Sequence, residues 1–91
     1  MKNLIEERRV GTFEISYDLI KLNWRDVLLL MRDVIIVRAE MMVHKNSIEY
    51  IAYSPKFEIC EEGIISPLYQ PEVHQAGKKK IIKWGKLDAS D

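Results

Sequence analysis

The residues of this 91-residue chain that could do chemistry are one cysteine, two histidines and a group of glutamates. Cys60 lies within an acidic stretch, residues 58–62, whereas nucleophilic cysteines are normally found beside positive charge. The spacing of Cys60, His44 and His74 matches no zinc motif, and a structural zinc site needs four ligands. The sequence therefore predicts neither a nucleophile nor a metal site.

Catalytic motifs are missing from the sequence. It has no Gly-rich phosphate loop, no nucleophile elbow and no group of acids and histidines at helical spacing. A run of loop carboxylates such as residues 58–62 is usually solvated, and an enzyme would need a pocket that no motif indicates. We expect a protein that is not an enzyme and that uses no cofactor or metal.

Charge is unevenly distributed along a chain whose formal net charge is zero. Residues 76–91 carry five lysines against two aspartates, and the remainder is mildly acidic. Lysines can neutralise phosphates, and a tryptophan can stack on an unpaired base. These features give nucleic-acid binding as an alternative function, through Lys78, Lys79, Lys80, Lys83, Trp84 and Lys86. A solubilising tail, or a final strand with a lysine-lined edge, would explain the same residues.

Length and composition indicate one globular domain. The chain is 47% hydrophobic and 31% charged, and none of its apolar runs approaches the roughly 18–20 residues of a membrane span. The N-terminal residues do not have the pattern of a signal peptide, and a single cysteine agrees with a reducing compartment. We expect a cytoplasmic protein that does not enter a membrane.

The first half of the chain predicts a strand followed by a helix. Residues 12–17 alternate polar and apolar side chains, which is typical of a half-buried strand. Asn23 is a favourable helix N-cap, and apolar residues follow at helical spacing as far as residue 33. Residues 18–22 are expected to connect the two elements.

The strongest structural signal is a β-hairpin over residues 34–54, with a turn at His44–Ser47. A helix continuing from residue 24 to Val43 is the alternative, since some apolar spacing persists. The β-branched run Val34–Val37 favours the strand. A turn centred on residues 45 and 46 would pair Val43 with Ile48 and would gather apolar side chains, among them Ile35, Val37 and Met41, on one core face.

The opposite face of this hairpin mixes apolar and charged side chains. A helix-covered face should be apolar and a solvated face mostly polar, so this mixture suits a protein–protein contact, including a homodimer. The residues predicted to form this interaction face are Ile36, Arg38, Glu40, Met42, Glu49, Ile51 and Tyr53. A solvent-exposed face with cross-strand pairs is the simpler alternative.

Taken together, these elements predict an α+β fold. We expect an antiparallel sheet of three to four strands in the order β-α-β-β, with one amphipathic helix packed on one face. Residues 68–74 would add a further strand. We expect it at an edge of the sheet, because Pro71 cannot donate a backbone hydrogen bond. Residues 1–76 would form the single domain, and residues 77–91 a basic C-terminal tail.

Part of the hairpin resembles a known group of proteins. The segments Arg38-Ala39-Glu40 and Ile48-Glu49-Tyr50, followed by Ala52, Ser54 and Phe57, resemble small uncharacterised accessory proteins of bacteriophage type. The resemblance covers about half of the chain, implies an accessory role in binding a macromolecule, and assigns no functional residue. The sequence thus predicts a small non-enzymatic interaction domain that binds a protein partner or itself.

Overall fold

The computed structural model describes residues 7–60 and 67–87 of the chain. It contains five strands, two α-helices and one 3-10 turn, and it confirms the α+β class and the predicted strand–helix–strand–strand order. The elements are β1 (Val10–Ser16), α1 (Tyr17–Leu22), α2 (Trp24–Met31), β2 (Ile35–Met42), η1 (Val43–Lys45), β3 (Ser47–Tyr53), β4 (Tyr69–Ala76) and β5 (Lys79–Lys86). Neither helix is long and apolar enough to cross a membrane, as far as the described residues go.

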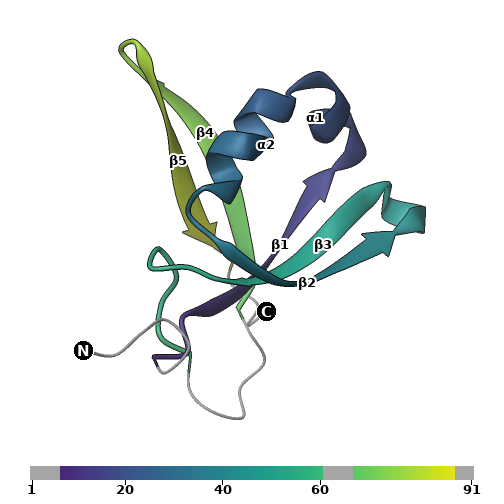
Figure 1. The fold of residues 1–91 in the computed structure, drawn as a ribbon, viewed down its shortest axis with the longest axis vertical. Helices are drawn as coiled ribbons and strands as arrows, with labels where there is room; N and C mark the ends of the chain where they lie inside the picture. The colour runs from purple at the N-terminus through teal and green to yellow at the C-terminus, as the bar shows by residue number, and fades with distance from the viewer. Residues whose placement is uncertain (1–6, 61–66, 88–91) are drawn as a thin grey trace.

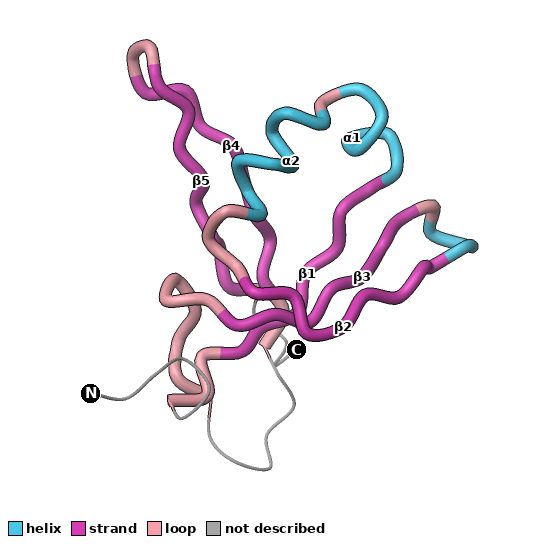
Figure 2. The backbone as a smooth tube through the Cα atoms, in the orientation of Figure 1, coloured by secondary structure: helices cyan, strands magenta, loops and turns pink. Residues whose placement is uncertain are grey.

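The strands form two sheets. The first is antiparallel with the order β1-β3-β2, so β3 is central and β2 lies at one margin (Figure 2). The second is the β4–β5 hairpin, which lies with both helices on the same side of the first sheet (Figure 1). The predicted further edge strand therefore pairs with β5, and among the described residues its backbone pairing with the first sheet is limited to a bridge between Leu68 and Thr12.

Two short helices replace the single predicted helix. Residues 18–22, expected as a connection, belong to α1, because the Ser16 side chain accepts a 3.2 Å hydrogen bond from the Leu19 N–H and so caps its start. Asn23 is the N-cap of α2 as predicted, but its side chain makes no capping bond. Its backbone carbonyl instead accepts a 3.0 Å bond from the Asp26 N–H.

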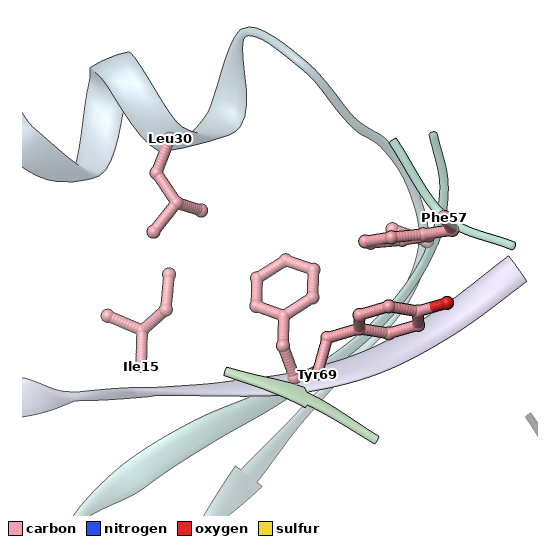
Figure 3. Close-up of a cluster of buried hydrophobic side chains, with 6 residues drawn as sticks. Ile15, Leu30, Phe57 and Tyr69 are labelled. Carbon is pink, nitrogen blue, oxygen red and sulfur yellow. The ribbon is translucent and has the colours of Figure 1, made fainter. Parts of the chain in front are cut away.

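The core is built around aromatic side chains from distant parts of the sequence. Phe57 stacks on Tyr69 with ring centroids 4.4 Å apart, and Trp84 meets both Phe13 and Phe57 at steep angles. Leu30 reaches down from α2 towards Ile15 of β1 (Figure 3). These contacts join the first sheet, α2 and the β4–β5 hairpin into one core.

The hairpin of β2 and β3 confirms the strand over the helical alternative, but its register differs from the predicted one by two residues. Met41 pairs with Ile48 and Ala39 with Tyr50, whereas the prediction paired Val43 with Ile48. The reason is the turn: Val43 belongs to η1, and Asn46 closes the turn with a left-handed φ of 53°. From Arg38 to Met42, a shift of two residues keeps each side chain on its predicted face.

A β-bulge corrects the prediction for Ile36. Ile36 pairs with Ala52 and Arg38 pairs with Ile51, which leaves Val37 as the extra residue of β2. Because one extra residue reverses the alternation, Ile36 lies on the core face with Ala52 and not on the outer face. Ile35 pairs with Tyr53 and lies on the outer face instead.

The segment predicted as a basic tail is, over its described residues, a strand of the fold. β5 pairs with β4 along its whole length, and Gly77 turns the chain between them with a φ of 64°. Ile82 and Trp84 pack against the core. The predicted boundary after residue 76 therefore falls inside a hairpin.

Gly11 allows β1 to pass close to the aromatic core. A Cβ atom at this position would lie 2.6 Å from the Tyr69 ring and 3.0 Å from the Phe57 ring. We expect Gly11→Ala to lower the free energy of unfolding by about 1–3 kcal/mol, because both rings are held by the core. Gly85→Ala is the matched control, since its Cβ would meet only the Gln70 carbonyl oxygen at 3.7 Å. Urea denaturation of both variants tests this; equal stabilities would contradict it.

Tyr50 gives the fold a dependence on alkaline pH. Burial, with a smaller contribution from Tyr17, raises the pKa of Tyr50 above its ordinary value of 10.0. The unfolded chain therefore loses this proton first, and the free energy of unfolding should fall as the pH rises above about 10. Tyr50→Phe should reduce this fall, measured by urea denaturation at several alkaline pH values and compared with neutral pH.

Candidate interaction surface

Six of the seven predicted interaction residues share the outer face of the first sheet. β3 alternates Glu49, Ile51 and Tyr53 on this face, all half-buried, and the alternation of β2 continues the face towards the sheet edge. The contributing residues of β2 are Arg38, Glu40 and Met42. Among the described helices and strands, all that pack on the first sheet lie on the opposite side (Figure 1).

A row of three glutamates crosses this outer face. Glu14 of β1 pairs with Glu49 of β3, which pairs in turn with Glu40 of β2. Like charges directly opposite each other on neighbouring strands are destabilising. Lys45 bonds the Glu14 carboxylate at 3.2 Å, and Arg38 approaches the Glu40 carboxylate at 3.9 Å. The row is therefore partly compensated at its two ends, and the ion pair at the β2 end is the longer of the two.

The β2 strand is exposed along nearly its whole length. Seven of its eight residues are exposed, and only Met42 is half-buried. Ile35, Val37 and Met41 are 61%, 58% and 59% exposed, although strands rich in such residues are normally buried. β2 therefore presents apolar side chains beyond those predicted for the outer face.

The two margins of the first sheet differ in how their backbone is covered. On the β1 side, the Thr12 N–H donates a 2.9 Å hydrogen bond to the Pro67 carbonyl, and Thr12 forms a bridge with Leu68. On the β2 side, the part of the chain that the structure describes supplies no pairing strand. β2 contains neither proline nor lysine, and its protection against pairing with another chain is limited to Arg38, Glu40 and the bulge at Val37.

The sequence did not reveal this edge. The sequence pattern assigned Ile35, Val37 and Met41 to a core face. Met41 does lie on the core face, opposite Ile48, but its side chain is exposed and not buried. The available signal was the run Val34–Val37, which is apolar on both sides of a strand. The position of β2 at the margin follows from β3 pairing with β1, which no local pattern specifies.

A second exposed apolar region lies on the two helices. Leu22 of α1 is 78% exposed, and Trp24 and Leu28 of α2 are also exposed. The Arg25 guanidinium lies 5.2 Å from the centre of the Trp24 ring, a cation–π distance. This region has no unpaired backbone edge, so it offers a partner fewer kinds of interaction than β2 does.

A groove of about 310 Å³ lies beside β1. Its lining comes from Phe13, Glu14, Leu68, Tyr69, Gln70 and Leu87. Glu14 is already bonded to Lys45, and the Tyr69 hydroxyl accepts a 2.9 Å bond from the Glu58 N–H. The two lining side chains that could transfer a proton, Glu14 and Tyr69, therefore each have a partner within the described residues.

The lysines of the predicted nucleic-acid site are dispersed. Lys80 bonds Asp26 at 3.0 Å and Lys86 bonds Glu58 at 2.6 Å. The Glu58 carboxylate accepts the hydrogen bond from Lys86 and raises the pKa of that lysine. Lys79 and Lys83 lie on the opposite face of β5, and Lys78 lies in the turn. The six predicted residues therefore do not form one basic surface.

Trp84 belongs to the core and not to an exposed platform. Its ring centroid lies 5.0 Å from that of Phe13 and 5.1 Å from that of Phe57. Base stacking requires an accessible ring face, whereas this ring is half-buried among its aromatic neighbours. The geometry gives the nucleic-acid alternative less support than its sequence pattern did.

The residues first considered for chemistry are spread over the fold. Cys60 is buried, His44 lies in η1 and His74 lies in β4. The described residues contain no group of three or more His, Cys, Asp or Glu side chains placed to hold a metal ion. Glu61 and Glu62 of the acidic stretch lie outside the described residues.

Comparison with known proteins adds no relative to these observations. The chain matches no protein-family model, no curated protein and no solved structure. The surface must therefore be interpreted from its own geometry.

The position of Trp84 predicts that this residue affects stability. Trp84→Ala should lower the free energy of unfolding by about 3 kcal/mol, because it removes a ring from the aromatic core. Lys83→Ala is the matched control on the exposed face of the same strand, with an expected change within about 0.5 kcal/mol. Urea denaturation measures both changes; a Trp84 variant as stable as the control would show that the ring is dispensable for packing.

Proposed function

We propose that this chain is a small non-enzymatic interaction domain that binds protein through the β2–β3 hairpin. The binding surface consists of the outer face of the hairpin and the margin of β2. The observation that carries the proposal is the exposure of seven of the eight residues of a largely apolar edge strand. Exposed apolar surface rimmed by charge is characteristic of protein interfaces.

An edge strand also supports a specific mode of binding. Its outward backbone N–H and C=O groups can pair with an added strand, while its side chains select the partner. The half-buried Ile51 and Tyr53 would extend the contact across the outer face. An accessory role of this kind agrees with the resemblance to bacteriophage-type proteins, and the cytoplasm is the compartment we propose for it.

Nucleic-acid binding through β5 is the second candidate, and it has weaker support. Two of the lysines of β5, Lys80 and Lys86, are held in ion pairs. Lys79 and Lys83 share the other face of the strand, and Lys78 lies in the turn before it. A phosphate backbone is bound best by a continuous basic stripe.

Affinity capture from an extract of the source organism tests the proposal. The bait proteins are the wild type, Met41→Lys and a matched control, Leu22→Lys, which places the same charge on an exposed leucine of α1. A lysine at the β2 edge disfavours strand addition. We expect a bound protein, a second copy of the chain included, to be retained by the wild type and the control and reduced at least tenfold by Met41→Lys. Identical bound proteins for all three baits would contradict the proposal.

A further inference from the structure

We infer that the partner of the β2 edge is a second copy of this chain, whose β2 pairs antiparallel with it about a two-fold axis at Ala39. The inference rests on the proposed function and deepens it by naming the protein that is bound. Pairing in this way would join two three-stranded sheets into one continuous sheet. The order of side chains along β2 supplies the evidence.

Symmetry restricts how two identical strands can pair. In an antiparallel pair, two residues opposite each other point their backbone N–H and C=O groups either both toward the partner strand or both away from it. Because this direction alternates along a strand, a residue cannot lie opposite its own neighbour in an identical strand. The two-fold axis must therefore pass between one residue and its own copy. With the axis at Ala39, Arg38 lies opposite Glu40 of the second copy, and Glu40 lies opposite its Arg38. Val37 and Met41 face each other in the same way. This register therefore makes two opposite-charge pairs and two apolar pairs.

The neighbouring registers are less favourable. An axis at Arg38 or at Glu40 places a like-charged pair at the centre of the contact. An axis at Met41 places Glu40 opposite Met42, and an axis at Val37 places Arg38 opposite Ile36. Among these registers, the one at Ala39 satisfies both charges of β2.

The glutamate row of the outer face gives an independent reason for this pairing. Glu40 ends the row at the β2 margin, beside Glu49 and with Arg38 of its own chain 3.9 Å away. In the proposed register, Arg38 of the second copy extends the same row beyond Glu40. A cation placed there offsets the repulsion between Glu40 and Glu49.

The bulge limits the strength of the association. β2 is regular from Arg38 to Met42, so both copies are regular only over Arg38–Glu40 in this register. The contacts of Val37 with Met41 flank this short ladder at the bulge. We therefore expect a weak, concentration-dependent dimer.

Sedimentation equilibrium over a concentration series tests the inference. The wild-type mass should rise from 10.7 kDa towards twice that value. Arg38→Glu and Glu40→Arg should each weaken dimerisation by about tenfold, because each makes both charge pairs repulsive. The double variant Arg38→Glu/Glu40→Arg should restore the wild-type affinity. Lys83→Glu, the same charge change on the exposed face of β5, is the control and should have no effect.

Two further measurements fix the register. Glu40→Gln should weaken the dimer if the axis is at Ala39, whereas it would strengthen a dimer with Glu40 at the axis. A mixture of the Arg38→Glu and Glu40→Arg chains should form heterodimers more readily than either forms homodimers. Circular dichroism checks that each variant is folded. We expect all of them to fold, because Arg38 and Glu40 are both exposed.

The outcomes separate this inference from the proposed function. A wild type that stays monomeric at every concentration, or a dimer unaffected by either charge reversal, overturns the inference. If the affinity capture still recovers a different protein that Met41→Lys loses, the proposed function stands without self-pairing. If no protein is lost, both fail.

Discussion

The packing of four aromatic rings is the interaction on which this structure depends. Phe13 comes from the first sheet, Phe57 from the segment after β3, and Tyr69 and Trp84 from the two strands of the second sheet. Because each ring belongs to a different segment, the cluster sets how the two sheets sit relative to each other. Helix α2 completes the same core with Leu30, which points toward Ile15 of β1 (Figure 3).

This arrangement concentrates burial on one side of the first sheet. The β1 and β3 strands receive the helices and the second hairpin, whereas β2 lies beyond their reach and keeps its side chains exposed. A small chain has limited apolar surface to distribute, and an uncovered apolar strand lowers the gain from folding. The exposure of β2 among the described residues is the feature on which the proposed binding role rests.

Local features of the sequence were sufficient for much of the fold. The alternation in residues 12–17 and the β-branched run Val34–Val37 identified strands, and Asn23 marked the start of α2. The hairpin register was off by two because both registers keep the same faces, and the choice depends on the Asn46 N–H bonding the Val43 carbonyl at 3.2 Å. The bulge at Val37 was missed for a similar reason, since nothing in the run distinguishes the extra residue.

Long-range packing explains the remaining differences. The lysines of residues 78–86 suggested a solvated tail, and the burial of Trp84 depends on rings that lie far away in the sequence. Likewise, the predicted interaction face could be placed on one side of the hairpin, but the edge position of β2 required the strand order. The sequence therefore grouped six of the seven predicted residues on one face, but it did not show that β2 is the margin without a pairing strand among the described residues.

The separation of the β4–β5 hairpin from the first sheet has a dynamic consequence. Among the described residues, few backbone hydrogen bonds other than that from Thr12 to Pro67 hold the β4–β5 hairpin to the first sheet. The attachment of the hairpin therefore depends on side-chain packing. Detaching the hairpin would remove Tyr69 and Trp84 from the aromatic core, so the two sheets should open together and not one at a time. The amides of both sheets should then exchange through one shared opening.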